Sequence, residues 1–232
     1  MKKTLFLLLG IGLSAPVWSQ SSCNSDGQPR VLALAERFIS ADCVECWSAP
    51  QPELNQARTL VLDWIVPSAL GNEAPLAPAA TRDALVRLQV LGKSAPAETM
   101  VTHHSVATYG GPELRVAQGL AIADYLGASI EVTRAKQHGA QPTWSIWLAL
   151  VETIPAGVEG TPVTRNLIRN LFQAVWNSSS KPSKQGQEKF HELRPMRFVE
   201  GASPERLRLV GWVQDAKGQM LAAAQTVCVP AK

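Results

Sequence analysis

The sequence predicts an α/β domain in the first half of the chain and a small β-sandwich-like domain in the second half. In the first half, apolar runs with the composition of buried strands alternate with segments of helical periodicity. In the second half, short segments of alternating apolar and polar residues follow one another. This change of pattern predicts an N-terminal domain over residues 20–127 and a β-rich C-terminal domain over residues 128–232.

Strands and helices are expected to alternate in the N-terminal half. The expected strands are Val31–Ser40, Thr59–Val66 and Thr99–Tyr109, which are rich in apolar and β-branched residues. Helical spacing predicts helices over residues 53–58, 81–92 and 112–126, and Thr81 is the N-cap candidate of the second. Such an alternation is typical of a layered α/β domain.

The C-terminal half is expected to consist mainly of strands. They fall within residues 129–135, 143–153, 194–200, 206–215 and 219–229. The tight-turn sequence Asp215–Gly218 joins the last two into a hairpin. A helical pattern over residues 163–175 interrupts the strands and would place Arg165 and Arg169 one turn apart on a solvated face. Trp144 and Trp147 are expected on opposite faces of one strand, one in the core and the other half exposed.

Residues 1–19 have the pattern of a secretory signal peptide. Two lysines precede an apolar stretch that is too short to span a bilayer, and small residues stand before the expected cut at Gln20. We therefore expect a periplasmic or secreted protein without a membrane span after cleavage. The alternative is a lipoprotein cut before Cys23.

The charge balance and the absent motifs exclude several classes of protein. Removing Lys2 and Lys3 with the signal peptide from the 22 basic residues leaves 20, against 19 acidic residues. A nucleic-acid-binding protein would need a concentrated basic face instead. The sequence contains no serine-hydrolase elbow, Walker loop or dinucleotide fingerprint, and we expect no cofactor.

Four cysteines remain after the signal peptide: Cys23, Cys43, Cys46 and Cys228. In an oxidising compartment such thiols tend to be paired, and four cysteines allow three pairings. Cys43 with Cys46 is the local pairing, and it leaves Cys23 and Cys228 for a structural disulfide that would tie the two chain ends together.

The cysteine pair Cys43–Cys46 follows a predicted strand and precedes a helical stretch, which resembles the thioredoxin fold. A closer resemblance is to a family of exported bacterial proteins of unknown function. In that family a thioredoxin-like domain with the motif F-T-S-Q-G-C-S-S-C-P-P-A-D precedes a β-rich domain. The matching positions here are Phe38, Ser40, Cys43, Cys46, Asp63, Trp64 and residues 166–171.

The resemblance implies a thioredoxin-like domain over residues 20–127 and a thiol–disulfide oxidoreductase or redox accessory factor. Cys43 would be the nucleophile and Cys46 the resolving thiol, with protein thiols or a redox partner protein as partners. Trp47, beside the cysteines, is a candidate for contacting substrate, and its alternative role is packing over the disulfide. His103 is a second candidate, because either it or Thr102 falls where thioredoxins carry their cis-proline.

The sequence also departs from the family motif. Asp42 replaces the glycine before the first cysteine, Trp47 and Ser48 replace the prolines after the second, and residues 101–111 contain no proline. The carboxylates of Asp42 and Glu45 disfavour a thiolate on Cys43, which predicts a reductant, an isomerase-like role or a permanent disulfide rather than a strong oxidant. The alternative is therefore a non-catalytic binding module in which the pair is structural. A metal site formed with a histidine is the third interpretation.

Overall fold

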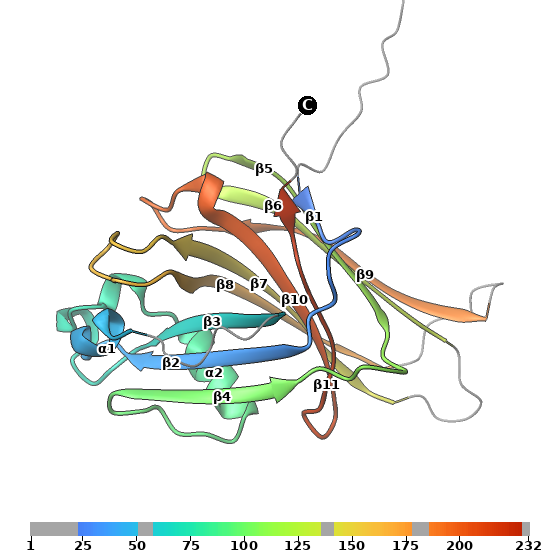
Figure 1. The fold of residues 1–232 in the computed structure, drawn as a ribbon, viewed down its shortest axis with the longest axis horizontal. Helices are drawn as coiled ribbons and strands as arrows, with labels where there is room; N and C mark the ends of the chain where they lie inside the picture. Colours follow the sequence, from blue (N-terminus) through green and yellow to red (C-terminus); the bar gives the residue numbers. More distant parts are fainter. Residues whose placement is uncertain (1–22, 51–57, 136–141, 178–185, 229–232) are drawn as a thin grey trace, which may run out of the picture.

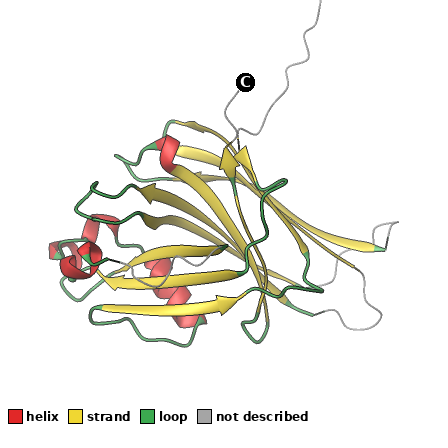
Figure 2. Cartoon of the chain, in the orientation of Figure 1, coloured by secondary structure: helices red, strands yellow, loops and turns green. Residues whose placement is uncertain are grey.

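Strands form most of the chain in the computed structural model, and they build two sheets that pack against each other (Figures 1 and 2). The structure describes residues 23–50, 58–135, 142–177 and 186–228. None of the described helices is long and apolar enough to cross a membrane. The expected signal peptide and the short helix expected within residues 53–58 lie almost entirely outside the described residues.

A mixed sheet of seven strands forms the larger layer. In spatial order it contains β11 (Met220–Gln225), β10 (Leu207–Asp215), β7 (Trp144–Ile154), β8 (Arg165–Trp176), β3 (Thr59–Val66), β2 (Ala33–Ser40) and β4 (Thr99–Ser105). The central strands β2 and β3 are parallel, and β4 runs antiparallel to β2. Strand β8 lies beside β3 in parallel, so strands from both halves of the chain share one sheet.

An antiparallel sheet of five strands forms the second layer. Its order is β12 (Val227–Cys228), β1 (Cys23–Asn24), β5 (Glu113–Ile122), β6 (Tyr125–Ala135) and β9 (Gln187–Arg197). The two layers approach closely at Gly211 of β10, where an added Cβ would lie 2.6 Å from Val116 Cγ1 of β5. A side chain at this position would therefore separate the sheets.

Two helices cover opposite faces of the larger sheet. The helix α1 (Val44–Ser48) follows β2, and α2 (Arg82–Val90) follows β3 by way of two 3₁₀ turns, η1 (Gly71–Glu73) and η2 (Ala77–Ala79). Because side chains alternate along a strand, Phe38 and Trp64 pack on the α2 side, whereas Ile39 and Ile65 pack on the α1 side. The five-stranded sheet lies on this second side too, against β7 and β10.

Several expected elements are confirmed. Strand β3 has the predicted bounds, β2 begins two residues later than predicted, and Thr81 caps α2 by accepting a hydrogen bond from the Asp83 amide. The turn at Asp215 is closed by the amide of Gly218, which donates to the Asp215 carbonyl at 3.0 Å. Trp144 and Trp147 do face opposite sides of β7, but both are buried rather than one half exposed.

The predicted α/β thioredoxin-like fold with a separate β-sandwich is wrong, because the chain is mostly β and its two sheets both combine strands from the two halves. Two predicted helices are mainly strands: most of residues 112–126 lies in β5 and the start of β6, and residues 165–175 of the second belong to β8. Both strands contain a register shift, and such a bulge interrupts the alternation of buried and exposed residues. The expected domain boundary at residues 127 and 128 falls inside β6.

Candidate functional site

The two neighbouring cysteines form a disulfide at the carboxyl end of β2. The Ala41 amide bonds to the Val66 carbonyl at the end of β3, and the Cys43 amide bonds to the Ser40 carbonyl. Cys43 is the N-cap of α1, and its Sγ accepts a hydrogen bond from the Cys46 amide at 3.2 Å. The sheet therefore fixes where the disulfide lies, and the first turn of α1 fixes its orientation.

The two cysteines differ in burial. Cys43 is 9% exposed, whereas Cys46 is half-buried and packs against the apolar residues beside α1. The thioredoxin resemblance implies Cys43 as the nucleophile, a role for which Cys43 would have to be the more accessible of the two. Cys46, the second cysteine, is thus the more exposed residue of the pair.

A buried arginine holds the carboxyl end of α1. Arg165, at the start of β8, is fully buried, and its Nη2 donates to the carbonyls of Trp47 at 2.6 Å and Ala49 at 2.5 Å. Its Nε donates to Thr161 Oγ1 at 3.1 Å. The carbonyls at the end of a helix carry partial negative charge, so a cation placed there stabilises the helix. Arg165 was predicted on a solvated helix face, and the structure corrects that placement.

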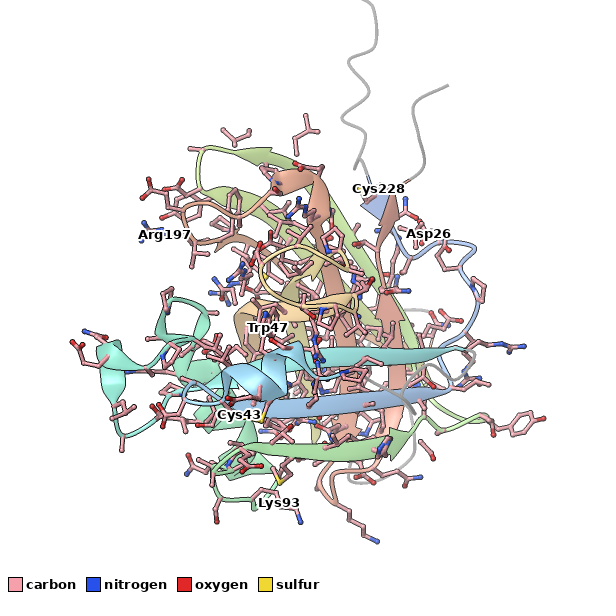
Figure 3. All side chains as sticks on the ribbon, turned by 60° about the vertical axis from the view of Figure 1, so that its left-hand side comes forward. Asp26, Cys43, Trp47, Lys93, Arg197 and Cys228 are labelled. Carbon is pink, nitrogen blue, oxygen red and sulfur yellow. A yellow bond between two sulfur atoms is a disulfide. The ribbon has the colours of Figure 1, made fainter. Side chains whose placement is uncertain are left out.

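Trp47 attaches α1 to the loop between β7 and β8. Its side chain is buried, and its Nε1 donates to the Glu159 carbonyl at 2.7 Å. The guanidinium of Arg165 lies over the indole at 5.4 Å from the ring centroid, and Ser48 Oγ donates to the Gly160 carbonyl. Figure 3 shows Trp47 above Cys43, on the side of α1 that faces the rest of the molecule. These contacts fix the indole of Trp47 against the β7–β8 loop.

The loop that receives Trp47 has an unusual backbone. Glu159 adopts a φ of 52°, and its neighbours Gly157 and Gly160 also have positive φ. A non-glycine residue in the left-handed region costs energy and persists only where its surroundings impose it. Here the hydrogen bond from Trp47 and the contacts of the Glu159 carboxylate with Arg169 at 4.0 Å and Arg206 at 3.8 Å supply that constraint.

A small apolar pocket lies beside Trp47. Its volume is about 130 Å³, and it is lined by Trp47, Ile65, Pro75, Leu76, Pro78, Ala79, Glu159 and Leu167. The Leu76 amide donates to the Ala41 carbonyl at 3.0 Å, which ties the pocket wall to the residues that lead into the cysteine pair. Cys46 packs on the same cluster of apolar residues as Leu76 and Ala79. The pocket and Cys46 therefore border the same apolar cluster.

A buried carboxylate lies two residues before Ile65 on the same face of the sheet. Asp63 is fully buried, its Oδ1 pairs with Arg37 Nη2 at 2.5 Å, and its Oδ2 accepts the Asn166 amide at 2.8 Å. Burial raises the pKa of Asp63 above its ordinary value, although Arg37 and the Asn166 amide oppose this shift. Asp63 joins β2, β3 and β8, which gives a structural reason for a carboxylate at this motif position.

Neither His103 nor His104 is brought to the cysteine pair. His103 is exposed and lies opposite Ala35 on β2, five residues before Ser40, so it is well along the strand from the disulfide. His104 points to the other face of the sheet, where its Nε2 lies 3.2 Å from Glu36 Oε2. Among the described residues no group of three or more metal-ligating side chains occurs.

The second disulfide joins Cys23 to Cys228, as predicted. It links the short strands β1 and β12, whose residues Cys23 and Cys228 are direct partners in the sheet. Figure 3 shows Cys228 far from Cys43, at another end of the molecule. This disulfide is a structural connection between the chain ends and takes no part in the site at α1.

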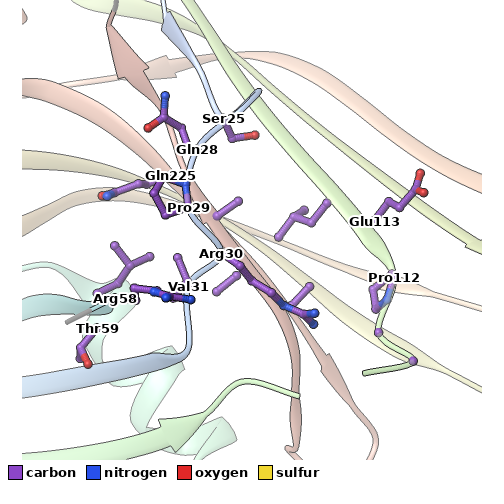
Figure 4. A pocket seen from close by; sticks show the side chains of 17 residues that line it. Ser25, Gln28, Pro29, Arg30, Val31, Arg58, Thr59, Pro112, Glu113 and Gln225 are labelled. Carbon is purple, nitrogen blue, oxygen red and sulfur yellow. The ribbon is translucent and has the colours of Figure 1, made fainter. Parts of the chain in front are cut away.

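A larger groove of about 590 Å³ lies at the amino ends of β2 and β3, away from the cysteine pair (Figure 4). Arg30 crosses it, and its guanidinium donates to the carbonyls of Ala107 and Thr108. Arg58, which has a φ of 62°, lies at its rim, and Ala222 to Ala224 line an apolar wall.

The sequence motif located the cysteine pair but not the residues that build the site around it. The loop glycines Gly157 and Gly160 and the Pro/Ala-rich stretch with Pro75 and Pro78 were the available signals. Such residues are typical of loops, and nothing in the sequence indicates that these loops pack on α1.

Comparison with known proteins adds little. No protein-family model and no curated protein matches the sequence. Among solved structures, HBP35 of Porphyromonas gingivalis is similar over 86% of this chain and 76% of that chain, with 9% sequence identity and a TM-score of 0.43. A likeness at this level supports no argument about fold or function, and the resemblance to the exported family stays a prediction.

Proposed function

We propose that this protein exchanges disulfides with protein thiols through Cys43 and Cys46, in an oxidising compartment outside the cytoplasm. The observation that carries the proposal is the attachment of α1. Arg165, Trp47 and Ser48 hold the helix to the β7–β8 loop through bonds that do not involve the disulfide. The helix can therefore keep its place when the disulfide opens, which a reversible exchange reaction requires.

A comparison of the two disulfides supports an exchange role for Cys43–Cys46 and a structural role for Cys23–Cys228. Cys23 and Cys228 are 205 residues apart in sequence, whereas Cys43 and Cys46 are only three apart. In the chain-entropy model the long connection stabilises the fold by about 5 kcal/mol and the short one by about 2 kcal/mol. The short disulfide is thus the weaker structural connection of the two.

The burial of the cysteines favours Cys46 as the point of attack. An incoming thiolate attacks the Cys46 sulfur and forms a mixed disulfide, while the Cys43–Cys46 bond breaks and its electron pair goes to Cys43. The resulting Cys43 thiolate accepts the hydrogen bond that the Cys46 amide already donates at 3.2 Å. A second substrate thiolate then attacks the substrate sulfur of the mixed disulfide and releases Cys46 as a thiolate. The substrate leaves oxidised, and the reverse sequence reduces it.

The reduction potential of the Cys43–Cys46 pair tests the proposal. We expect a value between about −120 and −270 mV when the purified protein is equilibrated in thiol redox buffers and trapped for mass spectrometry. The Cys23–Cys228 pair serves as the internal control and should stay oxidised throughout. A potential below about −300 mV, or a pair that opens only when the protein unfolds, would contradict the exchange role.

The groove between the sheets favours a second candidate function, a binding module in which both disulfides are structural. Its volume of about 590 Å³ lies within the range of small-molecule sites, and it combines an apolar wall with two arginines. This candidate stands if the cysteine pair does not exchange in the redox buffers.

A further inference from the structure

We propose that the substrates of this site are cationic peptide segments in which an apolar side chain neighbours the reacting cysteine. The apolar pocket beside Trp47 would receive that side chain, and the exposed carboxylates around the disulfide would attract the positive charge. This inference rests on the proposed exchange reaction and names its substrate class.

The pocket has the size and the lining for one apolar side chain. Its volume of about 130 Å³ is well below that of sites that enclose a small-molecule ligand. Leu76, Ala79 and Leu167 give it an apolar lining, and Pro75 and Pro78 stiffen the segment that forms one wall. A rigid pocket of this kind binds a side chain without a large ordering cost.

The pocket also lies within reach of the attacked sulfur. Cys46 packs on the same apolar cluster as Leu76 and Ala79, which line the pocket. Successive residues of an extended peptide are about 3.3 Å apart, so a residue close to the substrate cysteine can enter the pocket while that cysteine reacts.

The charges around the disulfide favour a positively charged substrate. The segments 41–50 and 67–80, which carry the cysteines and the pocket wall, contain three acidic residues and no lysine or arginine. Asp42, Glu45 and Glu73 are all exposed. Asp42 directly precedes Cys43, and its Oδ1 accepts a hydrogen bond from Ser68 Oγ at 2.6 Å. The nearby Arg165 is fully buried, and its Nη2 donates to backbone carbonyls, so it offers no exposed cationic group to an incoming peptide.

Three blocked peptide thiols test the inference. One carries lysine and leucine beside its cysteine, the second lysine and serine, and the third glutamate and leucine. The readout is the rate of mixed-disulfide formation with the oxidised protein, followed by mass spectrometry at low salt and at equal thiolate concentration. We expect the lysine–leucine peptide to react fastest, by about threefold or more over each of the others, and added salt to reduce its advantage over the glutamate peptide.

Two variants separate the charge from the pocket. Asp42→Asn combined with Glu45→Gln should remove most of the preference for lysine over glutamate and keep the preference for leucine over serine. Ala79→Leu, which fills the pocket, should do the reverse. Ser68→Ala is the matched control, because it removes the hydrogen bond to Asp42 and keeps the charge, and it should preserve both preferences.

The outcomes distinguish the two levels of the proposal. Equal rates for the three peptides would overturn the substrate inference and leave the exchange reaction standing. If none of the peptides forms a mixed disulfide, the exchange reaction fails, and the substrate inference fails with it.

Discussion

A buried arginine attaches each of the two helices to its own face of the larger sheet, but only one of the two faces keeps an open pocket. Arg87 projects from α2 into the sheet, where it binds Glu36 through Nε at 2.9 Å and Nη2 at 2.6 Å and Gln214 through Nη1 at 2.7 Å. It lies over the rings of Trp147 and Trp212, which stack at 5.7 Å. Every part of this contact is enclosed, and the α2 face is structural.

Arg165 works in the other direction, from the sheet towards α1. It satisfies the carbonyls at the end of α1, whereas the disulfide and the exposed carboxylates of Asp42 and Glu45 lie at the start of the helix, and an apolar pocket lies beside Trp47. The difference between the two faces shows which of them can bind another molecule. On the α2 face, aromatic rings occupy the space around the arginine, whereas on the α1 face a pocket lies near the disulfide.

Breaking the ion pair on the α2 face should give the largest loss of stability. Glu36→Gln leaves the fully buried Arg87 without its counter-charge, and such a change costs about 3–5 kcal/mol. We expect this loss in the free energy of unfolding measured with urea. The reduction potential of the cysteine pair should stay unchanged, because the two faces do not share contacts at these residues.

The matched control replaces both partners. Glu36→Gln combined with Arg87→Met removes the unpaired charge, so it should cost clearly less than Glu36→Gln alone. If the single and double variants are equally unstable, the ion pair is not what holds α2.

Weakening the attachment of α1 should cost less stability and change the redox chemistry. Arg165→Met leaves the carbonyls of Trp47 and Ala49 without a donor, at a cost of about 1–3 kcal/mol. Because α1 would then depend more on its disulfide, we expect the pair to become harder to reduce in thiol redox buffers. An unchanged potential would contradict the idea that Arg165 supports the reduced form.

The sequence predicted this contrast only in part, and the reason lies in two bulged strands. In β8, Asn170 faces Leu150 and Ile168 faces Val151, so Arg169 is the extra residue of a bulge. The bulge interrupts the alternation of buried and exposed residues that marks a strand. The two arginines, Arg165 and Arg169, are then four residues apart, which is the spacing expected on one face of a helix. This segment is a strand because it pairs with β7 and β3, and a short stretch of sequence read by itself does not reveal that pairing.

Features that depend on local chemistry were predicted better. The apolar runs of β2 and β3, the Thr81 cap and the pairing of the four cysteines follow from residue types at short range or from counting. The burial of Arg165 depends on its contacts with α1, and Trp47 of α1 bonds to the β7–β8 loop, although these segments are more than 100 residues apart in sequence. A single sequence carries no direct signal for such a contact.

Acid should affect the two buried carboxylates in opposite directions. Burial raises the pKa of Glu36, but Arg87 and His104 outweigh it and hold the pKa below its ordinary value of 4.5. The stability from Glu36 is therefore present above about pH 4.5 and is lost as the pH falls through the lowered pKa. The pKa of Asp63 is raised above 3.8, so its contribution is present below that pH and is lost as the pH rises through the raised value.

Urea unfolding at a series of pH values between neutral and acid measures both effects. We expect Glu36→Gln to lose less stability on acidification than the natural protein, and Asp63→Asn to lose more. Equal slopes for the two variants would contradict the assignment of opposite pKa shifts to the two faces.

The smallest change is expected from removing a single bond of the α1 face. Trp47→Phe keeps an aromatic ring at the pocket wall and deletes the hydrogen bond from Nε1 to the Glu159 carbonyl, which costs about 0.5–1.5 kcal/mol. Glu159 loses part of the constraint on its left-handed backbone, so Glu159→Gly should recover some of the lost stability in the Trp47→Phe background. Thermal unfolding of the single and double variants measures this recovery. If Glu159→Gly destabilises both backgrounds equally, the strained backbone at Glu159 is independent of the hydrogen bond from Trp47.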